Sequence, residues 1–441
     1  MTNYEPTTTA TVRRPRHRVT ASILGVLLTG SLALSGCSAT SSDDSTATTG
    51  ASPAVTDTSG SDSTGSTTSD ETSSSGTTTA TISDTAAAAQ AFLETLSDEQ
   101  REQVLYDYDD ETKTTSWSNF PVTFVERAGL NLTDLTEEQQ AAAMKVLEAL
   151  LSDEGYETVT GIIGGDEYLA QNSNSTEESL GQYYIAFFGD PSDSSAWEVQ
   201  FGGHHLGINA TLDGSSDEVT FAPTHLGSQP AVYTNKDGEE VQPLAGMYDT
   251  AFAFYDSLTD EQKEQLYQGE DVSNLVCAPG GTCDYPTGTG ISGADLTDEQ
   301  NLLLLDVIAN WVGLSDQETT DAALAEIEAT LDETYINWSG ATEYDMTSGD
   351  GIYFQISGPD VYIEFSNQQG SAGADVNGVV TAGWGHIHTI YRDPENDYAG
   401  SVTQQDASGM TGGPGGGGTP PEGGTAPADG TAPTSGRTDA S

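Results

Sequence analysis

Four short segments of the chain repeat one helix-start pattern, and this repeat limits the folds that the chain can adopt. Each has a Ser or Thr able to cap a helix, two acidic residues in the first turn, and a Gln placed to return the capping hydrogen bond. The segments are Leu96–Gln100, Leu135–Gln139, Leu258–Gln262 and Leu296–Gln300. The capping residues lie 39 and 38 residues apart within the two pairs, and the second pair follows the first by 162 and 161 residues. Two tandem related halves, about 86–230 and 245–403, are the simplest explanation.

Each half ends in two strand-like segments that are separated by a turn containing Gly and Pro. The strands are predicted at Gln182–Phe188 and Trp197–Phe201 in the first half, and at Gly351–Ser357 and Val361–Phe365 in the second. Alternating large apolar and polar residues with this punctuation are typical of antiparallel hairpins. Helices followed by paired strands indicate an α+β fold. We therefore predict one α+β domain over residues 86–403, with both hairpins in one shared sheet.

The N-terminus has the features of an export signal. A basic cluster, Arg13–Arg18, precedes the apolar run Val19–Leu34, which is too short for a stable transmembrane span. The run ends in Leu-Ser-Gly followed by Cys37, a sequence that suits cleavage before a lipid-modified cysteine. An ordinary cleavable signal with a chance cysteine is the alternative. We expect residues 1–36 to be a signal peptide and Cys37 to anchor the chain, by lipid, at the extracytoplasmic face of the cell membrane.

Two low-complexity segments flank the predicted domain. Residues 37–85 consist mainly of Ser, Thr, Asp, Gly and Ala and contain no aromatic residue to begin a core. They are predicted to form a disordered tether with an end-to-end distance of roughly 35–40 Å. Residues 404–441 are rich in Gly, Pro and Thr and are predicted to be a disordered tail. The glycine run in this tail lacks the lysine that a phosphate-binding loop needs.

Two further cysteines support an address outside the cytoplasm. Cys277 and Cys283 enclose the segment Ala-Pro-Gly-Gly-Thr, whose turn can bring the two sulfur atoms together. In an oxidising compartment we expect a disulfide between them. A pair of metal-binding thiolates is the alternative, although no partner ligands stand nearby in the sequence.

The charge of the chain restricts its partners. The chain has 69 acidic and 12 basic residues, a formal net charge of −57. Such a surface repels nucleic acid and anionic lipid headgroups, so we expect no nucleic-acid partner. The expected membrane contact is the lipid anchor alone.

Histidine is scarce, and four of the six histidines form two tight groups. One group is His204 and His205, and the other is His386 and His388, which lie two residues apart and so face the same way on a strand. With one histidine of the first group, they could bind a divalent transition metal, zinc above all, and an open position could hold a nucleophilic hydroxide. The alternative is a metal-free sheet in which the imidazoles bind backbone groups or line a polar groove.

Charged and aromatic side chains near these groups suggest further roles. Arg392 could bind a substrate carboxylate or phosphate, or it could form an ion pair with a neighbouring acid. The candidates for a fourth ligand or a general base are Glu364, Asp393 and Asp397. Trp197 and Trp384 each precede a histidine group, and could stack against a glycan or simply pack in the core.

The fifth histidine outside the signal region is assigned no binding role. His225 lies in a stretch that looks like a loop, and we expect it to be structural or exposed. The chain also lacks the common nucleophile-elbow, Walker, dinucleotide and His-Glu-x-x-His motifs, which disfavours the enzyme classes that carry them.

The spacing of these residues resembles the bacterial family called domain of unknown function 3500. The resemblance covers about 86–400 and depends on Gly-Gly-His-His-Leu and on His-x-His followed by Tyr-Arg-Asp and Asp-Tyr. The matching positions are His204, His205, Asn209, Glu364, His386, His388, Arg392, Asp393, Asp397 and Tyr398. The resemblance adds Asn209 and Tyr398 to Arg392 as candidate substrate-binding residues, and relatives tend to carry an aromatic residue in place of His225. It implies where a site lies and names no activity.

Two functional hypotheses follow. In the first, the chain is a membrane-anchored metal-binding protein, extending to a metal-dependent hydrolase. In the second, it is a metal-free binding module of the cell envelope for a small molecule or a glycan. Bound metal, and the distance between the two histidine groups, distinguish them.

Overall fold

The computed structural model describes residues 76–405, apart from residues 179, 278, 347–349 and 371–373. The predicted signal peptide, Cys37, the tether up to residue 75 and the tail from residue 406 lie outside the described residues. The α-helices are α1 (Thr78–Glu94), α2 (Asp98–Val104), α3 (Thr112–Thr115), α4 (Glu137–Leu150), α5 (Asp153–Asn172), α6 (Ala245–Ser257), α7 (Asp260–Leu266), α8 (Asp298–Val312) and α9 (Gln317–Ala329). Among the helices of this described part, none is both long and apolar enough to cross a membrane.

Most strands of the described chain join one mixed sheet. The strands are β1 (Leu105–Tyr106), β2 (Leu130–Asn131), β3 (Tyr184–Phe188), β4 (Ala196–Gly202), β5 (Leu206–Asp213), β6 (Glu218–Thr220), β7 (Thr224–Ser228), β8 (Tyr233–Thr234), β9 (Glu240–Val241), β10 (Ile291–Ser292), β11 (Tyr335–Gly340), β12 (Ile352–Ser357), β13 (Tyr362–Asn367) and β14 (Ile387–Arg392). Twelve of them form the order β1-β3-β4-β5-β7-β14-β13-β12-β11-β10, with β2 beside β3 and β6 beside β5. The α+β class is therefore confirmed.

All four repeated segments begin helices through a complete capping box. In each box the side chain of the capping residue accepts a hydrogen bond from the backbone N–H of the Gln three residues later, and the side-chain oxygen of that Gln accepts one from the backbone N–H of the capping residue. The capping residues are Ser97, Thr136, Thr259 and Thr297. The capping glutamines also join helices in pairs. Gln139 Nε2 donates to Gln100 Oε1 over 3.1 Å, and the Gln262 and Gln300 amides lie 2.9 Å apart. The local prediction of helix starts is confirmed in each case.

Both predicted hairpins are also present. Strand β3 pairs with β4 and strand β12 pairs with β13, each antiparallel and in continuous register. The predicted start of the folded region at residue 86 is too late, because α1 begins at Thr78. Thr77 caps this helix, and Ile82 and the Thr85 side chain are buried, so the Thr-rich end of the predicted tether is part of the fold.

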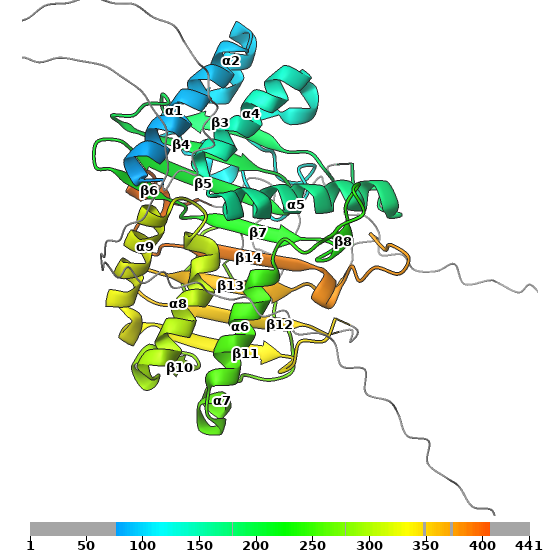
Figure 1. Ribbon diagram of the computed structural model, residues 1–441, viewed down its shortest axis with the longest axis vertical. Helices are drawn as coiled ribbons and strands as arrows, with labels where there is room; N and C mark the ends of the chain where they lie inside the picture. The colour runs from blue at the N-terminus through cyan, green and yellow to red at the C-terminus, as the bar shows by residue number, and fades with distance from the viewer. Residues whose placement is uncertain (1–75, 179, 278, 347–349, 371–373, 406–441) are drawn as a thin grey trace, which may run out of the picture. The chain divides into compact units, whose positions relative to one another are not determined.

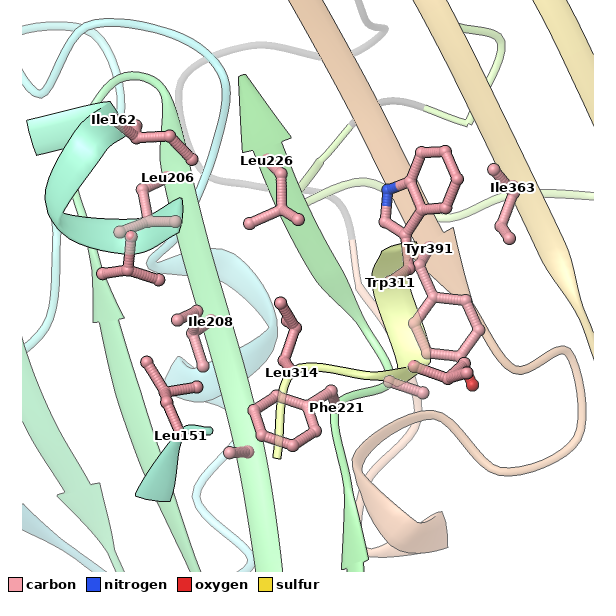
Figure 2. Packing of buried hydrophobic residues seen from close by; sticks show 14 of the residues in the cluster. Leu151, Ile162, Leu206, Ile208, Phe221, Leu226, Trp311, Leu314, Ile363 and Tyr391 are labelled. Atoms are coloured by element: carbon pink, nitrogen blue, oxygen red, sulfur yellow. The ribbon is translucent and has the colours of Figure 1, made fainter. Parts of the chain in front are cut away.

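The helices cover one face of the sheet. Figure 1 shows α4, α5, α6, α8 and α9 in front of the strands. One large apolar core lies between these layers, and Figure 2 shows part of it, including Leu206 and Ile208 of β5, Leu226 of β7 and Trp311 of α8. Trp311 also donates its indole N–H to the Thr389 hydroxyl of β14 over 2.9 Å. This core fixes the central strands from the helical side.

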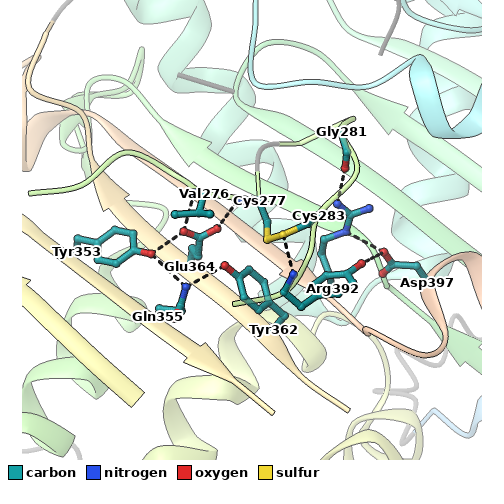
Figure 3. Close-up of a disulfide and its surroundings, with 11 residues drawn as sticks. Val276, Cys277, Gly281, Cys283, Tyr353, Gln355, Tyr362, Glu364, Arg392 and Asp397 are labelled. Atoms are coloured by element: carbon teal, nitrogen blue, oxygen red, sulfur yellow. Dashed lines mark hydrogen bonds and ion pairs between the residues drawn. A yellow bond between two sulfur atoms is a disulfide. The ribbon is translucent and has the colours of Figure 1, made fainter. Parts of the chain in front are cut away.

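Loops cover the other face. A second apolar cluster there joins Trp117 to Leu275, Cys277, Tyr362 and Ile390. The expected disulfide between Cys277 and Cys283 is present, with their Cα atoms 5.1 Å apart. Figure 3 shows the disulfide above Tyr362 and Arg392, which belong to β13 and β14. The loop that carries the disulfide is thus held against the centre of the sheet.

Candidate metal centre

All five histidines of the described residues meet at the centre of the sheet. His204 and His205 lie in the turn between β4 and β5, and His225 lies on β7. His386 immediately precedes β14, and His388 is the second residue of that strand. Strand β7 pairs with both β5 and β14, so that Gly207 faces His225 and Gly227 faces His388 in register. Glycine at position 227 leaves room for the neighbouring imidazole, because an added Cβ would lie 3.2 Å from the His388 ring. The pairing of β7 with β14 therefore assembles the cluster.

The imidazole rings are in direct contact. The ring centroids of His204 and His205 are 4.2 Å apart, and those of His386 and His388 are 4.8 Å apart. The two groups also touch one another, since the His205 ring lies 5.5 Å from His386 and 5.4 Å from His388. His225 lies 5.4 Å from His388. The two groups are therefore close enough to share one ion.

Acceptors fix the proton position on three of the rings. His205 Nδ1 lies 2.5 Å from the Asp166 carboxylate of α5, His386 Nδ1 lies 2.8 Å from the Gly370 carbonyl, and His225 Nδ1 lies 2.7 Å from the Thr389 carbonyl. Carbonyl and carboxylate oxygens only accept, so each Nδ1 carries the proton and each Nε2 presents a lone pair. This orientation by a carboxylate or carbonyl is typical of metal-binding histidines.

The lone pairs that remain face one another inside the protein. His205 Nε2 and His386 Nε2 are 3.4 Å apart, although both are acceptors in these tautomers. His204 Nδ1, His225 Nε2 and His388 Nε2 are buried and have no hydrogen-bond partner. The Asn119 amide nitrogen lies 3.1 Å from His388 Nδ1 and donates to it, so Nδ1 accepts and Nε2 carries the proton of this ring. A 180° flip of the amide, whose oxygen has no partner, would let Nδ1 hold the proton and would leave Nε2 with a lone pair. Buried acceptors without a donor are rare, and a bound ion or an ordered water molecule can supply the partner.

The electrostatic environment keeps the rings neutral. Burial lowers the pKa of His205 and His386 to about 3, and that of His225 to about 4. Burial raises the pKa of Asp166 to about 6, while the Tyr183 hydroxyl donates to this carboxylate over 2.7 Å. At pH 7 the cluster therefore offers neutral imidazole nitrogens beside one carboxylate, which is the protonation state that metal binding requires.

The spacing of the nitrogens fits a metal site that is slightly open. One ring nitrogen from each of His204, His205 and His388 lies within 4.8 Å of the other two. Bonds of about 2.0–2.1 Å in a tetrahedron place ligand nitrogens roughly 3–4 Å apart, as the 3.4 Å between His205 and His386 already does. His204 is partly exposed, whereas His386 and His388 are only 6% and 4% exposed, so access is through the His204 side.

A family model described as a protein of unknown function, DUF3500, matches residues 78–400. The chain belongs to the DUF3500 family. No match is found among curated proteins or among solved structures. The matched range includes all five clustered histidines, and it begins at the residue where α1 begins.

In this DUF3500 domain, Arg392 forms an ion pair with Asp397. This is the second of the two roles predicted for Arg392, an ion pair with a neighbouring acid in place of a substrate contact. Arg392 is fully buried, its Nε lies 2.8 Å from Asp397, and its Nη1 donates to the Gly281 carbonyl of the disulfide loop. Figure 3 shows both contacts. Asp397 also accepts from the Tyr285 hydroxyl. Arg392 therefore holds the loop against the sheet and does not reach the histidines.

The other carboxylates named from the sequence are engaged away from the histidine cluster. Glu364 is fully buried and accepts from the backbone N–H groups of Val276 and Cys277 and from the Tyr353 hydroxyl, as Figure 3 shows. Asp393 accepts from two backbone N–H groups in the turn that follows β14. The carboxylate that does contact the cluster is that of Asp166.

The remaining candidate side chains, Asn209, Tyr398, Trp197 and Trp384, are all buried. Asn209 donates to the Pro223 carbonyl and accepts from Gln200, and the Tyr398 hydroxyl accepts from the Trp117 indole. Trp197 and Trp384 are fully buried in the core, so neither offers a surface to a glycan. Within the described part of the chain, Asn209, Trp197 and Tyr398 make their hydrogen bonds to groups other than a histidine ring.

Sequence reasoning missed two members of the site. The expectation that His225 lies in a loop or is exposed is wrong, because it lies on β7 and is fully buried beside His388. Its hydrogen bond to the Thr389 carbonyl agrees with the structural role that was also expected. Asp166 was not considered, because it lies on a helix far from any histidine in the sequence. An acid on the buried face of α5, beside Ile162 and Gly165, was the signal that could have identified it.

Proposed function

We propose that this chain binds one divalent transition metal ion, zinc in the first instance, at the histidine cluster. The observation that carries the proposal is the set of buried imidazole nitrogens whose lone pairs meet without any donor between them. His204, His205, His386 and His388 are the proposed ligands. His225 stands next to them with its own free nitrogen. A cation at this point would remove the mutual repulsion of the lone pairs.

The chemistry of the donors supports a first-row metal. Imidazole nitrogens suit zinc, copper and nickel, whereas calcium and magnesium prefer oxygen ligands. Asp166 supports the proposal from outside the ligand set, because its contact with His205 fixes the ring and raises the basicity of Nε2. Neither Cys277 nor Cys283 is a candidate ligand, since the two are joined to each other.

Metal binding is better supported than hydrolysis. A hydrolase of the expected kind needs a carboxylate free to act as general base beside the metal. Glu364 and Asp397 are occupied by other donors, and Asp166 is bound to both His205 and Tyr183. We therefore propose a binding protein and retain the metal-free envelope module as the alternative that the experiment below tests.

The test is the metal content of the purified full-length chain. The chain is produced with zinc, copper, nickel and manganese supplied, and bound metal is measured by mass spectrometry. We expect close to one ion per chain, and loss of nearly all of it in the double variant His386→Ala, His388→Ala. The matched control is Gln171→Ala, Asn172→Ala, which truncates two exposed side chains at the end of α5. Unmutated chain without stoichiometric metal would leave the metal-free module as the better hypothesis.

We also propose that the chain is a lipoprotein held at the extracytoplasmic face of the cell membrane. The support is the basic and apolar leader that ends at Cys37, together with a disulfide, which persists outside the reducing cytoplasm. In cells given a labelled fatty acid, the unmutated chain should carry label and sediment with membranes. The variant Cys37→Ser should do neither. Label that persists in this variant would exclude Cys37 as the anchor.

We further propose that the two halves descend from one duplicated unit that now shares a sheet. The support is that α2 and α4 are linked by capping glutamines in the same way as α7 and α8. Each half also has an antiparallel hairpin after its helices. Superposition of residues 96–202 on residues 258–366 tests this, because duplication requires the equivalent helices and hairpins to coincide in order and direction.

A further inference from the structure

One segment without helix or strand, residues 116–127, reaches both histidine groups, and we call it the strap. Its beginning is fixed to the neighbouring structure by two buried side chains. The Ser116 hydroxyl donates to Gln200 Oε1 of β4 over 2.6 Å, and the Trp117 indole donates to the Tyr398 hydroxyl over 2.8 Å. The strap therefore starts at a fixed point on the face of the sheet that the loops cover.

The other end of the strap is fixed by a buried guanidinium. Arg127 donates from Nε and from Nη2 to the Gly203 carbonyl, over 3.3 and 2.8 Å. Nη2 also donates to the carbonyls of Ser118 and Phe120, over 2.7 and 2.6 Å, and Nη1 donates to the carbonyl of Val125. Gly203 immediately precedes the first histidine group. One side chain thus joins three carbonyls of the strap to the turn that carries this group.

Between these two ends the strap places a buried amide beside the second histidine group. Asn119 is 2% exposed, and its Nδ2 lies 3.1 Å from Nδ1 of His388. In this orientation the amide donates, so the proton of the neutral His388 ring is on Nε2. Asn119 Oδ1 and His388 Nε2 are both buried, and within the described part of the chain neither has a hydrogen-bond partner. The orphaned oxygen is the acceptor that the other tautomer of His388 requires.

A half turn of the amide gives the ring its second tautomer. With Oδ1 toward the ring, Nδ1 carries the proton and donates it, and Nε2 presents a lone pair to the cluster. One proton leaves Nε2 and one arrives at Nδ1, so the ring stays neutral. His205 has no such choice, because the ionised carboxylate of Asp166 beside its Nδ1 only accepts. His388 is therefore the ring whose free nitrogen depends on the orientation of a neighbour.

We propose that Asn119 is a positioning residue that decides whether His388 can bind metal, and that the strap holds it in place. In the metal-free protein the amide nitrogen faces the ring, and the proton on Nε2 occupies the ligand position. On metal binding the amide turns, Oδ1 accepts from Nδ1, and Nε2 is free to coordinate. This inference rests on the proposed metal site, and it makes the binding of His388 the step that the strap regulates.

The first test needs no metal. Nitrogen NMR of the metal-free full-length chain, made with isotope-labelled histidine, distinguishes a protonated from an unprotonated ring nitrogen, and the spectrum of His388→Gln identifies the signals of this ring. We expect the Nε2–H tautomer of His388 in the unmutated chain. In Asn119→Asp we expect the Nδ1–H tautomer, because a carboxylate only accepts. The Nδ1–H tautomer in the unmutated chain, or one tautomer in both proteins, would overturn the proposal.

The second test is competition for zinc with a chromophoric chelator. Asn119→Asp should bind zinc about fivefold more tightly than the unmutated chain, because a charged acceptor forms the stronger hydrogen bond and no amide has to turn. Asn119→Leu removes the acceptor and should weaken zinc binding by about tenfold or more. The matched control is Asn172→Asp, which adds the same charge at an exposed position of α5 and should change the affinity by less than about twofold.

The opposite signs separate positioning from a merely structural role, which would weaken zinc binding in both Asn119 variants and would overturn the proposal. Thermal unfolding of the metal-free variants checks that each one folds. The strap itself is tested with Arg127→Lys, which keeps the charge but cannot join the same set of carbonyls. In this background Asn119→Asp should change the affinity by less than about twofold, because the new carboxylate is no longer held against the ring.

The remaining outcomes distinguish the failure of this inference from the failure of the metal site. The full fivefold gain in the Arg127→Lys background would overturn the role of the strap. Zinc affinity that is equal in the unmutated chain, Asn119→Asp and Asn119→Leu would overturn the role of Asn119 and leave the metal site standing. An unmutated chain that binds no zinc would overturn the metal site itself, whichever tautomer the NMR spectrum shows.

Discussion

Replacing Asp166 by asparagine tests whether the orientation of His205 controls metal binding. In the unmutated protein the carboxylate accepts from His205 Nδ1 over 2.5 Å and from the Tyr183 hydroxyl over 2.7 Å. In Asp166→Asn only the amide oxygen can accept, and Tyr183 can donate nowhere else in this contact. The amide nitrogen then faces His205 Nδ1 and favours the tautomer with its proton on Nε2. That proton blocks the ligand position.

The expected loss follows from the hydrogen bond that is removed. A hydrogen bond to a charged group contributes about 1.5–3 kcal/mol, and about 1.4 kcal/mol corresponds to a tenfold change in affinity. We therefore expect metal affinity to fall by about 10- to 100-fold, which is the usual effect of losing an outer carboxylate at a metal site. The stability of the metal-free protein should change less, because burial already disfavours the Asp166 charge and raises its pKa to about 6.

The assay is competition for zinc with a chromophoric chelator at pH 7. Asp153→Asn is the control, because it removes an exposed acid from the same helix. Tyr183→Phe should weaken binding by a smaller factor, since it removes one donor and leaves the carboxylate in place. The reasoning is refuted if Asp166→Asn binds zinc within about twofold of the unmutated chain, or if Asp153→Asn loses as much.

Three further predictions concern the fold around the site. Lys113 and Glu198 form a fully buried ion pair of 3.1 Å, so Lys113→Met should lower the free energy of unfolding by about 3–5 kcal/mol, because it leaves the Glu198 charge unpaired. The double variant Lys113→Met, Glu198→Leu should recover most of that loss. Urea unfolding that shows no recovery in the double variant would contradict this prediction. Replacing Cys277 and Cys283 by serine should cost about 2–3 kcal/mol through the entropy of the opened loop, and an unchanged urea midpoint would show that Glu364 and Arg392 hold the loop alone. Burial raises the pKa of Asp393 to about 6, above its ordinary value of 3.8, so its contribution to stability is present below pH 3.8 and is lost as the pH rises through about 6. Asp393→Asn should therefore be the more stable protein above pH 6, and the difference in melting temperature should vanish near pH 4; a constant difference would count against the buried charge.

The histidine cluster shows how strand order creates a site from distant parts of the chain. His205 and His386 are 181 residues apart in the sequence, and their nitrogens are 3.4 Å apart. A metal ion at this point would join the β4–β5 turn to β14. Because such an ion binds the folded chain and not the unfolded one, it should also raise the thermal stability.

The sequence by itself determined the features that depend on near neighbours. A capping box involves residues three apart, so Ser97 with Gln100 and its three counterparts could be identified without any tertiary information. The hairpins followed from alternation and turn residues, and the disulfide from two cysteines with a turn between them. The His-x-His pair at the beginning of β14, His386 just before the strand and His388 within it, was found because alternation in extended chain places both rings on one face.

Only the tertiary structure decided which polar groups meet. The insertion of β7 between β5 and β14 is a long-range pairing, and it brings His225 into the cluster although its local sequence resembles a loop. Asp166 reaches His205 because α5 packs across the end of these strands, a contact that no spacing in the sequence encodes. Several acidic residues near Arg392 in the sequence were possible partners for its charge. In the structure Arg392 is fully buried and pairs with Asp397, because a buried cation needs a partner of opposite charge. Local interactions fixed the elements, and packing between distant elements chose the partners of their side chains.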